Sequence, residues 1–160
     1  MRECRREQAA RQEESDKNSG VTLLVARLGV GVIFLTSGVG KLAAWSATAA
    51  FAGSKGVPTV LLAAATVLEL LGGISVLAGW KARWGAAALI AFLVPVTLVF
   101  HDFWAYQGAE AQLQTIQFLK NVSIGGGLLA IFAAGPGALS VDARHSRADA
   151  VHGTPARVPA

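Results

Sequence analysis

Two ionisable side chains of this sequence lie inside stretches that are otherwise apolar. Glu69 lies near the middle of the run from Pro58 to Gly79, and Arg27 lies six residues into the run that begins at Val21. A charge in the middle of a bilayer costs about 2.5–3.5 kcal/mol, so each must face protein, water or an opposite charge. By helix rise, Arg27 would lie ~9 Å and Glu69 ~15 Å from one surface. We therefore predict an Arg27–Glu69 ion pair, with either a packing role or a functional one.

A second group of polar residues is expected near the opposite surface. His101 and Asp102 follow the third apolar run, and Gln114, Gln117, Lys120 and Asn121 share one edge of the fourth, while Lys41 ends the first. Amines, an imidazole and amides at one depth suit the carbonyl groups of a quinone or a small anion. The alternatives are that Lys120 snorkels to the interface and that His101 caps a helix. The candidate ligand-binding residues are Arg27, Lys41, Glu69, His101, Gln117, Lys120 and Asn121.

Metal and haem sites are not expected. The sequence has no His-x-x-His or Glu-x-x-His pair, and two of its three histidines, His145 and His152, lie in the C-terminal tail. Its one cysteine, Cys4, lies in the N-terminal tail, so there is no intramolecular disulfide and no Cys-x-x-Cys redox pair. We expect no intrinsic cofactor, which leaves a quinone as the candidate ligand.

The elements that must position these residues are four apolar segments. Each is long enough to cross a hydrocarbon core of about 30 Å as a helix, and none alternates with the period of a barrel strand. The sequence therefore predicts an all-α integral membrane four-helix bundle of antiparallel, up-down topology, with helices at about 21–40, 58–79, 84–100 and 116–134. Residues 1–20 form a charged tail and residues 143–160 a flexible one.

The charges support this layout and orient it. Of the 160 residues 53% are hydrophobic and only 15% charged, and ten of the charged ones lie in the first 20 residues. Lys and Arg outside the spans number ten on the side of the two termini and two on the other, so both termini should be cytoplasmic. The net charge of +4 is spread without a basic run, so nucleic-acid binding is not expected.

Small residues predict close helix packing. Arg27, Gly31, Phe34, Gly38 and Lys41 fall on one face of the first helix, and Gly72 and Gly73 follow Glu69 on the second. In the fourth helix Ser123 and Gly127, and Gly126 and Ala130, are small-xxx-small pairs. A homodimer through such glycine faces is one expectation for assembly.

These motifs, in this order, resemble the DoxX family of small bacterial four-helix membrane proteins. The resemblance runs from Val21 to about Asp142 and rests on five motifs, namely Ala26–Gly29 with Ser37–Leu42, Leu68–Gly73, Phe100–Trp104, Gln117–Asn121, and Gly135–Gly137 with Ser140 and Asp142. It implies a bacterial inner-membrane location and a kinship to the membrane subunit of a thiosulfate:quinone oxidoreductase. It implies no established catalytic residue.

The leading functional hypothesis is a membrane subunit of a redox or oxidative-stress complex, with a quinone between the helices and catalysis supplied by a soluble redox partner. If the chain takes part in an enzyme, it would be as a subunit of a membrane quinone-linked oxidoreductase. Two other classes stay open. One is a small transporter or channel subunit with a buried Arg27–Glu69 gate, and the other is a structural membrane scaffold.

Overall fold

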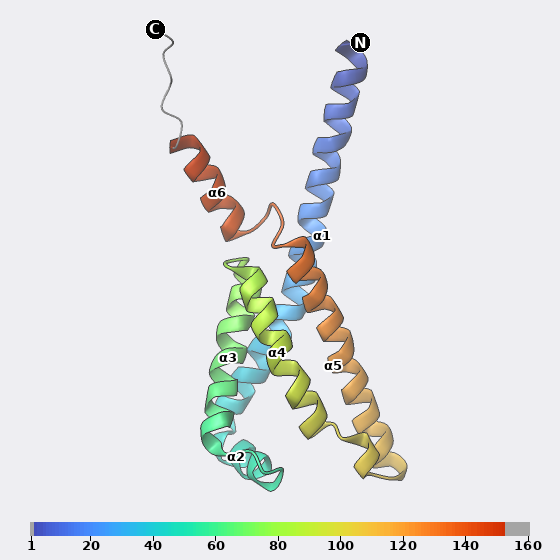
Figure 1. Cartoon of the computed structure of the whole chain (residues 1–160), viewed down its shortest axis with the longest axis vertical. Helices are drawn as coiled ribbons and strands as arrows, with labels where there is room; N and C mark the ends of the chain where they lie inside the picture. Colours follow the sequence, from blue (N-terminus) through green and yellow to red (C-terminus); the bar gives the residue numbers. More distant parts are fainter. Residues whose placement is uncertain (1, 153–160) are drawn as a thin grey trace.

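The computed structural model describes residues 2–152, and every regular element in this part of the chain is a helix. Figure 1 shows how the helices follow one another up and down the molecule. The elements are α1 (Arg2–Ala43), α2 (Trp45–Ser54), α3 (Thr59–Ala78), α4 (Ala82–Phe100), the short 3-10 helix η1 (Phe103–Ala105), α5 (Gly108–Ala134) and α6 (Val141–His152).

Four segments of the described chain are long and apolar enough to cross a membrane. They are Lys17–Ala43 in α1, Thr59–Ala78, Ala82–Ala105 and Gly108–Ala134. Successive spans run in opposite directions, so the start of α1 and the whole of α6 lie at the same end of the bundle (Figure 1). The predicted all-α, antiparallel membrane bundle is confirmed.

The helices extend beyond the predicted bounds. α1 starts at Arg2 and α5 at Gly108, and the segment predicted as flexible from Ala143 is helical as far as His152. The Arg, Glu, Gln and Ala residues of these extensions are good helix formers, and a helix needs no apolar residues to continue into water. The rest of the predicted C-terminal tail lies outside the described residues.

α2 lies within the bundle and was not among the four predicted helices. Trp45–Ser54 was expected to be part of a loop, but its Ala-rich sequence contains no helix breaker before Gly53. α2 packs against α1 and α3 at the end of the bundle opposite the termini. We name this the outer end, and the end that carries α6 the inner end.

The α3–α4 turn is built from residues suited to a tight reversal. Gly79 ends α3 with a φ of +69°, a left-handed conformation that glycine adopts without a Cβ clash. The N–H of Trp80 donates to the Ser75 carbonyl at 3.1 Å, which closes the last turn. This reversal places α4 directly beside α3.

The helices approach closely where the sequence has glycine. A Cβ atom at Gly31 of α1 would lie 3.0 Å from the Leu77 Cβ and 3.2 Å from the Gly73 carbonyl oxygen of α3. A Cβ at Gly72 would lie 2.7 Å from the Leu89 Cγ of α4. These seams hold α3 between α1 and α4, while α5 packs against α4.

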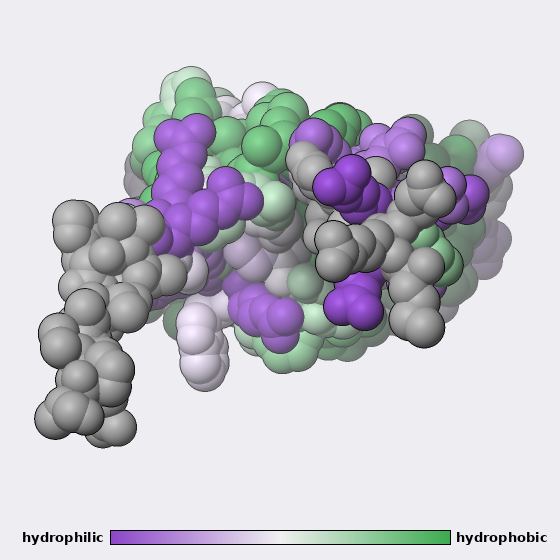
Figure 2. All heavy atoms as spheres, turned by 90° about the horizontal axis from the view of Figure 1, so that it is seen from above, coloured by the Kyte–Doolittle hydropathy of each residue, from purple (hydrophilic) through white to green (hydrophobic). Residues whose placement is uncertain are grey.

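The core occupies the inner half and middle of the bundle, and apolar residues also cover its outside. The buried cluster consists of Phe34, Val76, Ala86, Leu89, Phe92, Leu93, Ile124, Leu128 and Ile131. Many large apolar side chains face outward, as in Val25, Leu71 and Ile116. Figure 2, which views the inner end, shows hydrophilic residues gathered there and hydrophobic residues along the flanks. This distribution is what a bilayer requires of a spanning bundle.

Candidate functional site

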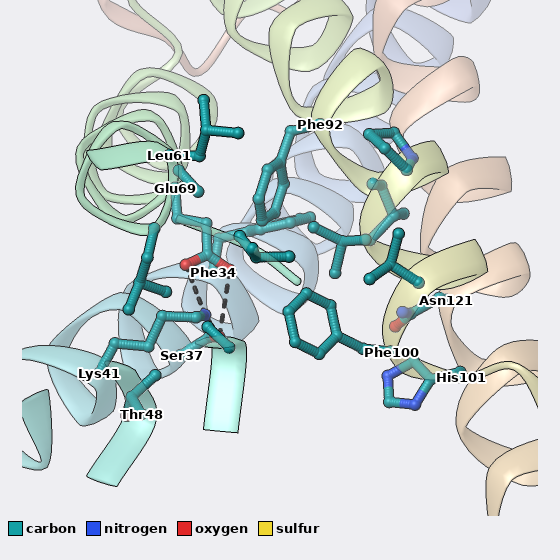
Figure 3. Close-up of a pocket in the computed structure, with 18 of the residues that line it drawn as sticks. Phe34, Ser37, Lys41, Thr48, Leu61, Glu69, Phe92, Phe100, His101 and Asn121 are labelled. Carbon is teal, nitrogen blue, oxygen red and sulfur yellow. Dashed lines mark hydrogen bonds and ion pairs between the residues drawn. The ribbon is translucent and has the colours of Figure 1, made fainter. Parts of the chain in front are cut away.

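The outer half of the bundle contains a cavity of about 590 Å³ to which all four spanning helices and α2 contribute. Its lining is mainly apolar, and its polar side chains other than Thr48 of α2 lie on two walls. One wall carries Ser37, Lys41 and Glu69, and the other carries His101, Lys120 and Asn121. Figure 3 shows Phe34, Phe92 and Phe100 between Lys41 and Glu69 on one side and His101 and Asn121 on the other.

A buried ion pair forms the first wall. Glu69 is only 3% exposed, and its Oε2 accepts from the Lys41 Nζ at 2.6 Å. The Ser37 hydroxyl donates to Oε1 of Glu69 at 3.2 Å and accepts from Lys41 at 2.7 Å. Lys41 lies one helical turn after Ser37, so both project from the same face of α1. Gly38, between them, lets α1 approach Leu70 and Glu69 of α3.

The donors of this wall are not fully used. An ammonium group has three N–H donors, and Lys41 directs two of them to Ser37 and Glu69. The Ser37 hydroxyl has one O–H donor, and it uses that donor in the hydrogen bond to Glu69. One N–H of Lys41 is therefore available to an acceptor in the cavity.

The predicted Arg27–Glu69 pair is wrong. The Arg27 guanidinium donates instead to the backbone carbonyls of Leu77 and Leu139. Arg27 is level with Gly79, where a Cβ would collide with the guanidinium, and Glu69 lies ten residues, or ~15 Å, further along α3. The prediction measured the membrane depths of Arg27 and Glu69 from the ends of their own apolar runs. In the structure these ends are not level, because α1 is displaced along α3.

Arg27 belongs to a junction at the inner end. It is 1% exposed, and its Nε has no hydrogen-bond partner among the described residues. The chain between α5 and α6 folds over it, and in the first turn of α6 Asp142 accepts a hydrogen bond from the Lys81 backbone N–H at 2.9 Å. Arg27 therefore fastens this turn to the bundle and lies outside the cavity.

The second wall is formed by the end of α4 and the middle of α5. His101 contacts Gln114 through Nδ1, at 3.0 Å from the amide oxygen, and the Asn121 amide donates to the Thr97 hydroxyl at 3.1 Å. Lys120 has no hydrogen bond or ion pair with any residue of the described chain. Gln117 does not line the cavity. Of the seven candidates, the structure gathers Lys41, Glu69, His101, Lys120 and Asn121, and leaves Arg27 and Gln117 out.

α2 closes the outer end of the cavity. Its Phe51 ring lies 5.7 Å from the Phe100 ring, between centroids. Lys55, just after α2, pairs with Asp102 at 2.8 Å and with the Tyr106 hydroxyl at 3.0 Å. The hydrogen bond to Asp102, followed by that to Tyr106, raises the pKa of Lys55 above its ordinary 10.5, so the amine is charged at neutral pH.

Sequence reasoning missed Ser37, Phe51 and Lys55. Ser37 could have been found, because it lies one turn before Lys41 on the predicted inward face of the first helix. Phe51 and Lys55 could not, because their contacts depend on a helix that was not expected. Among residues 2–152, no group of three or more His, Cys, Asp or Glu side chains is placed to hold a metal ion.

Known proteins resemble this chain over most of its length. It is 33% identical over 126 residues to the inner membrane protein YqjF of Escherichia coli strain K12, covering 79% of this chain and 93% of that protein. It is 35% identical over 126 residues to the inner membrane protein YphA of the same strain, covering 78% and 90%. A fainter likeness, 28% over 129 residues, links it to 35% of the length of the ER-derived vesicles protein ERV29 of Saccharomyces cerevisiae.

No solved structure matches the chain. The DoxX family model matches residues 22–102, which hold α2, α3, α4 and most of the spanning part of α1, and therefore both sides of the Lys41–Glu69 pair and His101. Together with the two Escherichia coli relatives, this match shows that the chain belongs to the DoxX family of membrane proteins.

Proposed function

We propose that this chain is an inner-membrane protein that binds a quinone between its spanning helices, as the membrane subunit of a redox complex. The observation that carries the proposal is the cavity of about 590 Å³ with polar groups on two walls and aromatic rings between them. Such a site, apolar with a few convergent polar groups, is typical of small-molecule binding.

A quinone ring matches this arrangement in shape and polarity. It is flat, and its two carbonyl oxygens lie at opposite ends of the ring. The free N–H of Lys41 suits one carbonyl, and the Lys120 ammonium or the Asn121 amide suits the other. Phe34, Phe92 and Phe100 supply apolar surface for the ring itself.

The cavity also reaches the lipid side of the bundle, as an isoprenoid tail would require. Ile33, Leu61 and Val99 line the cavity and are 43%, 58% and 37% exposed. A tail could leave between the helices at these residues and lie among the acyl chains. The ligand would then enter from the membrane without crossing the polar ends of the bundle.

A partner would supply the electron-transferring group. Cys4, the single cysteine of the sequence, lies on the charged first turns of α1, at the end of the molecule opposite the cavity. Dithiol chemistry near the quinone would therefore come from another protein. The helical extension of α1 and α6 project from the same inner end, where a soluble enzyme could dock (Figure 1).

The test is an equilibrium titration of the full chain in nanodiscs with a short-chain ubiquinone, preceded by extraction of whatever lipid-soluble molecule co-purifies. Glu69→Gln should weaken binding because Lys41 would lose its carboxylate partner and its position. Lys120→Met should weaken binding about tenfold, which corresponds to one charge-assisted hydrogen bond. Lys81→Met makes the same chemical change at the inner end and should bind as the wild type does.

The outcomes separate the three classes of function. Unchanged binding in both cavity variants would remove the site. Loss of stability with unchanged binding would favour a scaffold in which the Lys41–Glu69 pair only fixes packing. Solute flux in liposomes, abolished by Glu69→Gln, would favour a transporter, although a gate made by Arg27 and Glu69 is incompatible with their separation.

A further inference from the structure

His101 is the first member of a chain of three hydrogen-bonded side chains. Its Nδ1 lies 3.0 Å from Oε1 of Gln114, and the Gln114 Nε2 donates to the Glu110 carboxylate at 2.9 Å. Glu110 and Gln114 are one turn apart near the start of α5, and His101 follows the last residue of α4. The chain leads from the exposed surface to the cavity.

These hydrogen bonds determine which nitrogen of His101 carries the proton. An ionised carboxylate only accepts hydrogen bonds, so the amide NH₂ of Gln114 must face Glu110. The amide oxygen then faces His101 and can only accept, which requires a hydrogen on Nδ1. A neutral imidazole protonated on Nδ1 has a bare Nε2, and that nitrogen is an acceptor.

The bare Nε2 is available to a ligand. No residue of the described chain bonds to it, and His101 lines the cavity. Among the charged groups around it, Asp102 is already paired with Lys55, Glu110 ends the hydrogen-bond chain through Gln114, and Lys120 lines the same wall. Lys41 and Glu69 lie on the opposite wall, where the ammonium and the carboxylate pair with each other.

We infer that Gln114 is a positioning residue that holds His101 with Nε2 as an acceptor, and that Nε2 accepts a hydrogen bond from a hydroxyl of the reduced, hydroquinone form of the ligand. This inference rests on the proposed function and deepens it. A quinone carbonyl has no hydrogen to offer Nε2, whereas a hydroquinone hydroxyl has one. The cavity should therefore prefer the reduced form.

The tautomer can be measured without any quinone. In full-length protein labelled with ¹⁵N-histidine, in mildly alkaline buffer, the resonances lost in His101→Gln identify His101 among the three histidines. The expected spectrum has the proton on Nδ1. Gln114→Leu should shift the equilibrium towards the Nε2-protonated form, and Gln112→Leu, an exposed neighbour on α5, should not. A proton on Nε2 in the wild type, or no response to Gln114→Leu, would overturn the role of Gln114.

The preference for the reduced form is measured by titrating the same proteins with short-chain ubiquinol and ubiquinone under anaerobic conditions. The wild type and Gln112→Leu should bind the quinol about fivefold more tightly, as one neutral hydrogen bond allows. Gln114→Leu should lose that preference while still binding the quinone. Equal affinities in the wild type would overturn the inference. If neither form bound, the proposed function would fail and the ligand assignment with it, while the histidine spectrum would still decide the role of Gln114.

Discussion

At the scale of the residue, the main feature of the structure is a carboxylate buried inside an apolar bundle. Glu69 is almost fully buried, and both of its oxygens accept from α1, one from Lys41 and one from Ser37. Taking a charge out of water costs several kcal/mol, which the geometry of its partners must offset. The pair therefore fixes the register of α1 on α3 and leaves Lys41 with a donor for a ligand.

Breaking this pair from one side should destabilise the protein. Lys41→Met leaves the Glu69 carboxylate buried without its cation, and we expect a loss of about 2–3 kcal/mol because Lys41 is 23% exposed. The double variant Lys41→Met/Glu69→Leu removes both charges and should recover much of that loss. Denaturant unfolding in detergent measures both. A double variant less stable than the single one would contradict this account.

The sequence predicted the burial of the charged residues correctly but not the ion pairs that they form. Glu69 and Arg27 were both expected inside, and both are. Their pairing was wrong because the ends of an apolar run do not define a common membrane depth for two helices. The Glu69 partner was already among the candidates, as Lys41, but only the register of α1 on α3 decides between two cations on one face.

At the scale of the element, two helix seams that are close-packed at glycine lie beside the cavity. Gly31 and Gly73 bring the backbones of α1 and α3 together in the inner half, and Gly72 leaves space on α3 for the Leu89 side chain of α4. In Figure 1 the outer ends of α4 and α5 diverge from α3, and α2 lies at the outer end of the bundle. Close packing at one end and divergence at the other thus place the site.

A pair of glycines on α1 tests this seam. Gly31→Ala puts a Cβ against the Leu77 side chain and the Gly73 carbonyl, so we expect a destabilisation of about 1–3 kcal/mol. Gly29→Ala meets no atom within 4 Å and should be neutral or stabilising by up to about 1 kcal/mol. Thermal unfolding in detergent compares them. Equal effects of the two substitutions would show that the seam is not close-packed.

The glycines of α5 were only partly understood from the sequence. Gly127 packs against Val30 of α1, 3.1 Å from the position of an added Cβ, as a small-xxx-small pair predicts. Gly126 meets nothing within 4 Å and is exposed, because it lies on a different face of the helix that points away from α1. The spacing shows that close approach is allowed but not which face is used. A homodimer through that exposed face stays a prediction.

At the scale of the whole molecule, the described residues form four apolar spans with a polar end that carries the start of α1 and α6. The hydrophobic spans could be predicted from the sequence because length and hydropathy decide them locally. α2 could not be predicted in this way, because the sequence of a short Ala-rich segment is compatible with a loop or a helix. Its packing against α1 and α3 decides between them.

Topology is the next prediction. Lys and Arg are concentrated at the inner end, so both termini should face the cytoplasm. Fusions of green fluorescent protein to either terminus should fluoresce, and fusions of alkaline phosphatase at the same positions should be inactive. Active phosphatase at either terminus would reverse the orientation and place the cavity near the cytoplasmic surface.

The most direct test of the account is whether a quinone occupies the cavity, and one substitution can fill that space without touching a charge. Ala65 lines the cavity one turn before Glu69, and Ala91 is exposed on α4 and lines no cavity. In titrations of the full chain with a short-chain ubiquinone, the wild type and Ala91→Leu should bind equally. Ala65→Leu should lose at least about tenfold in affinity while keeping its thermal stability. Equal binding by all three proteins, or no binding by the wild type, would contradict the account.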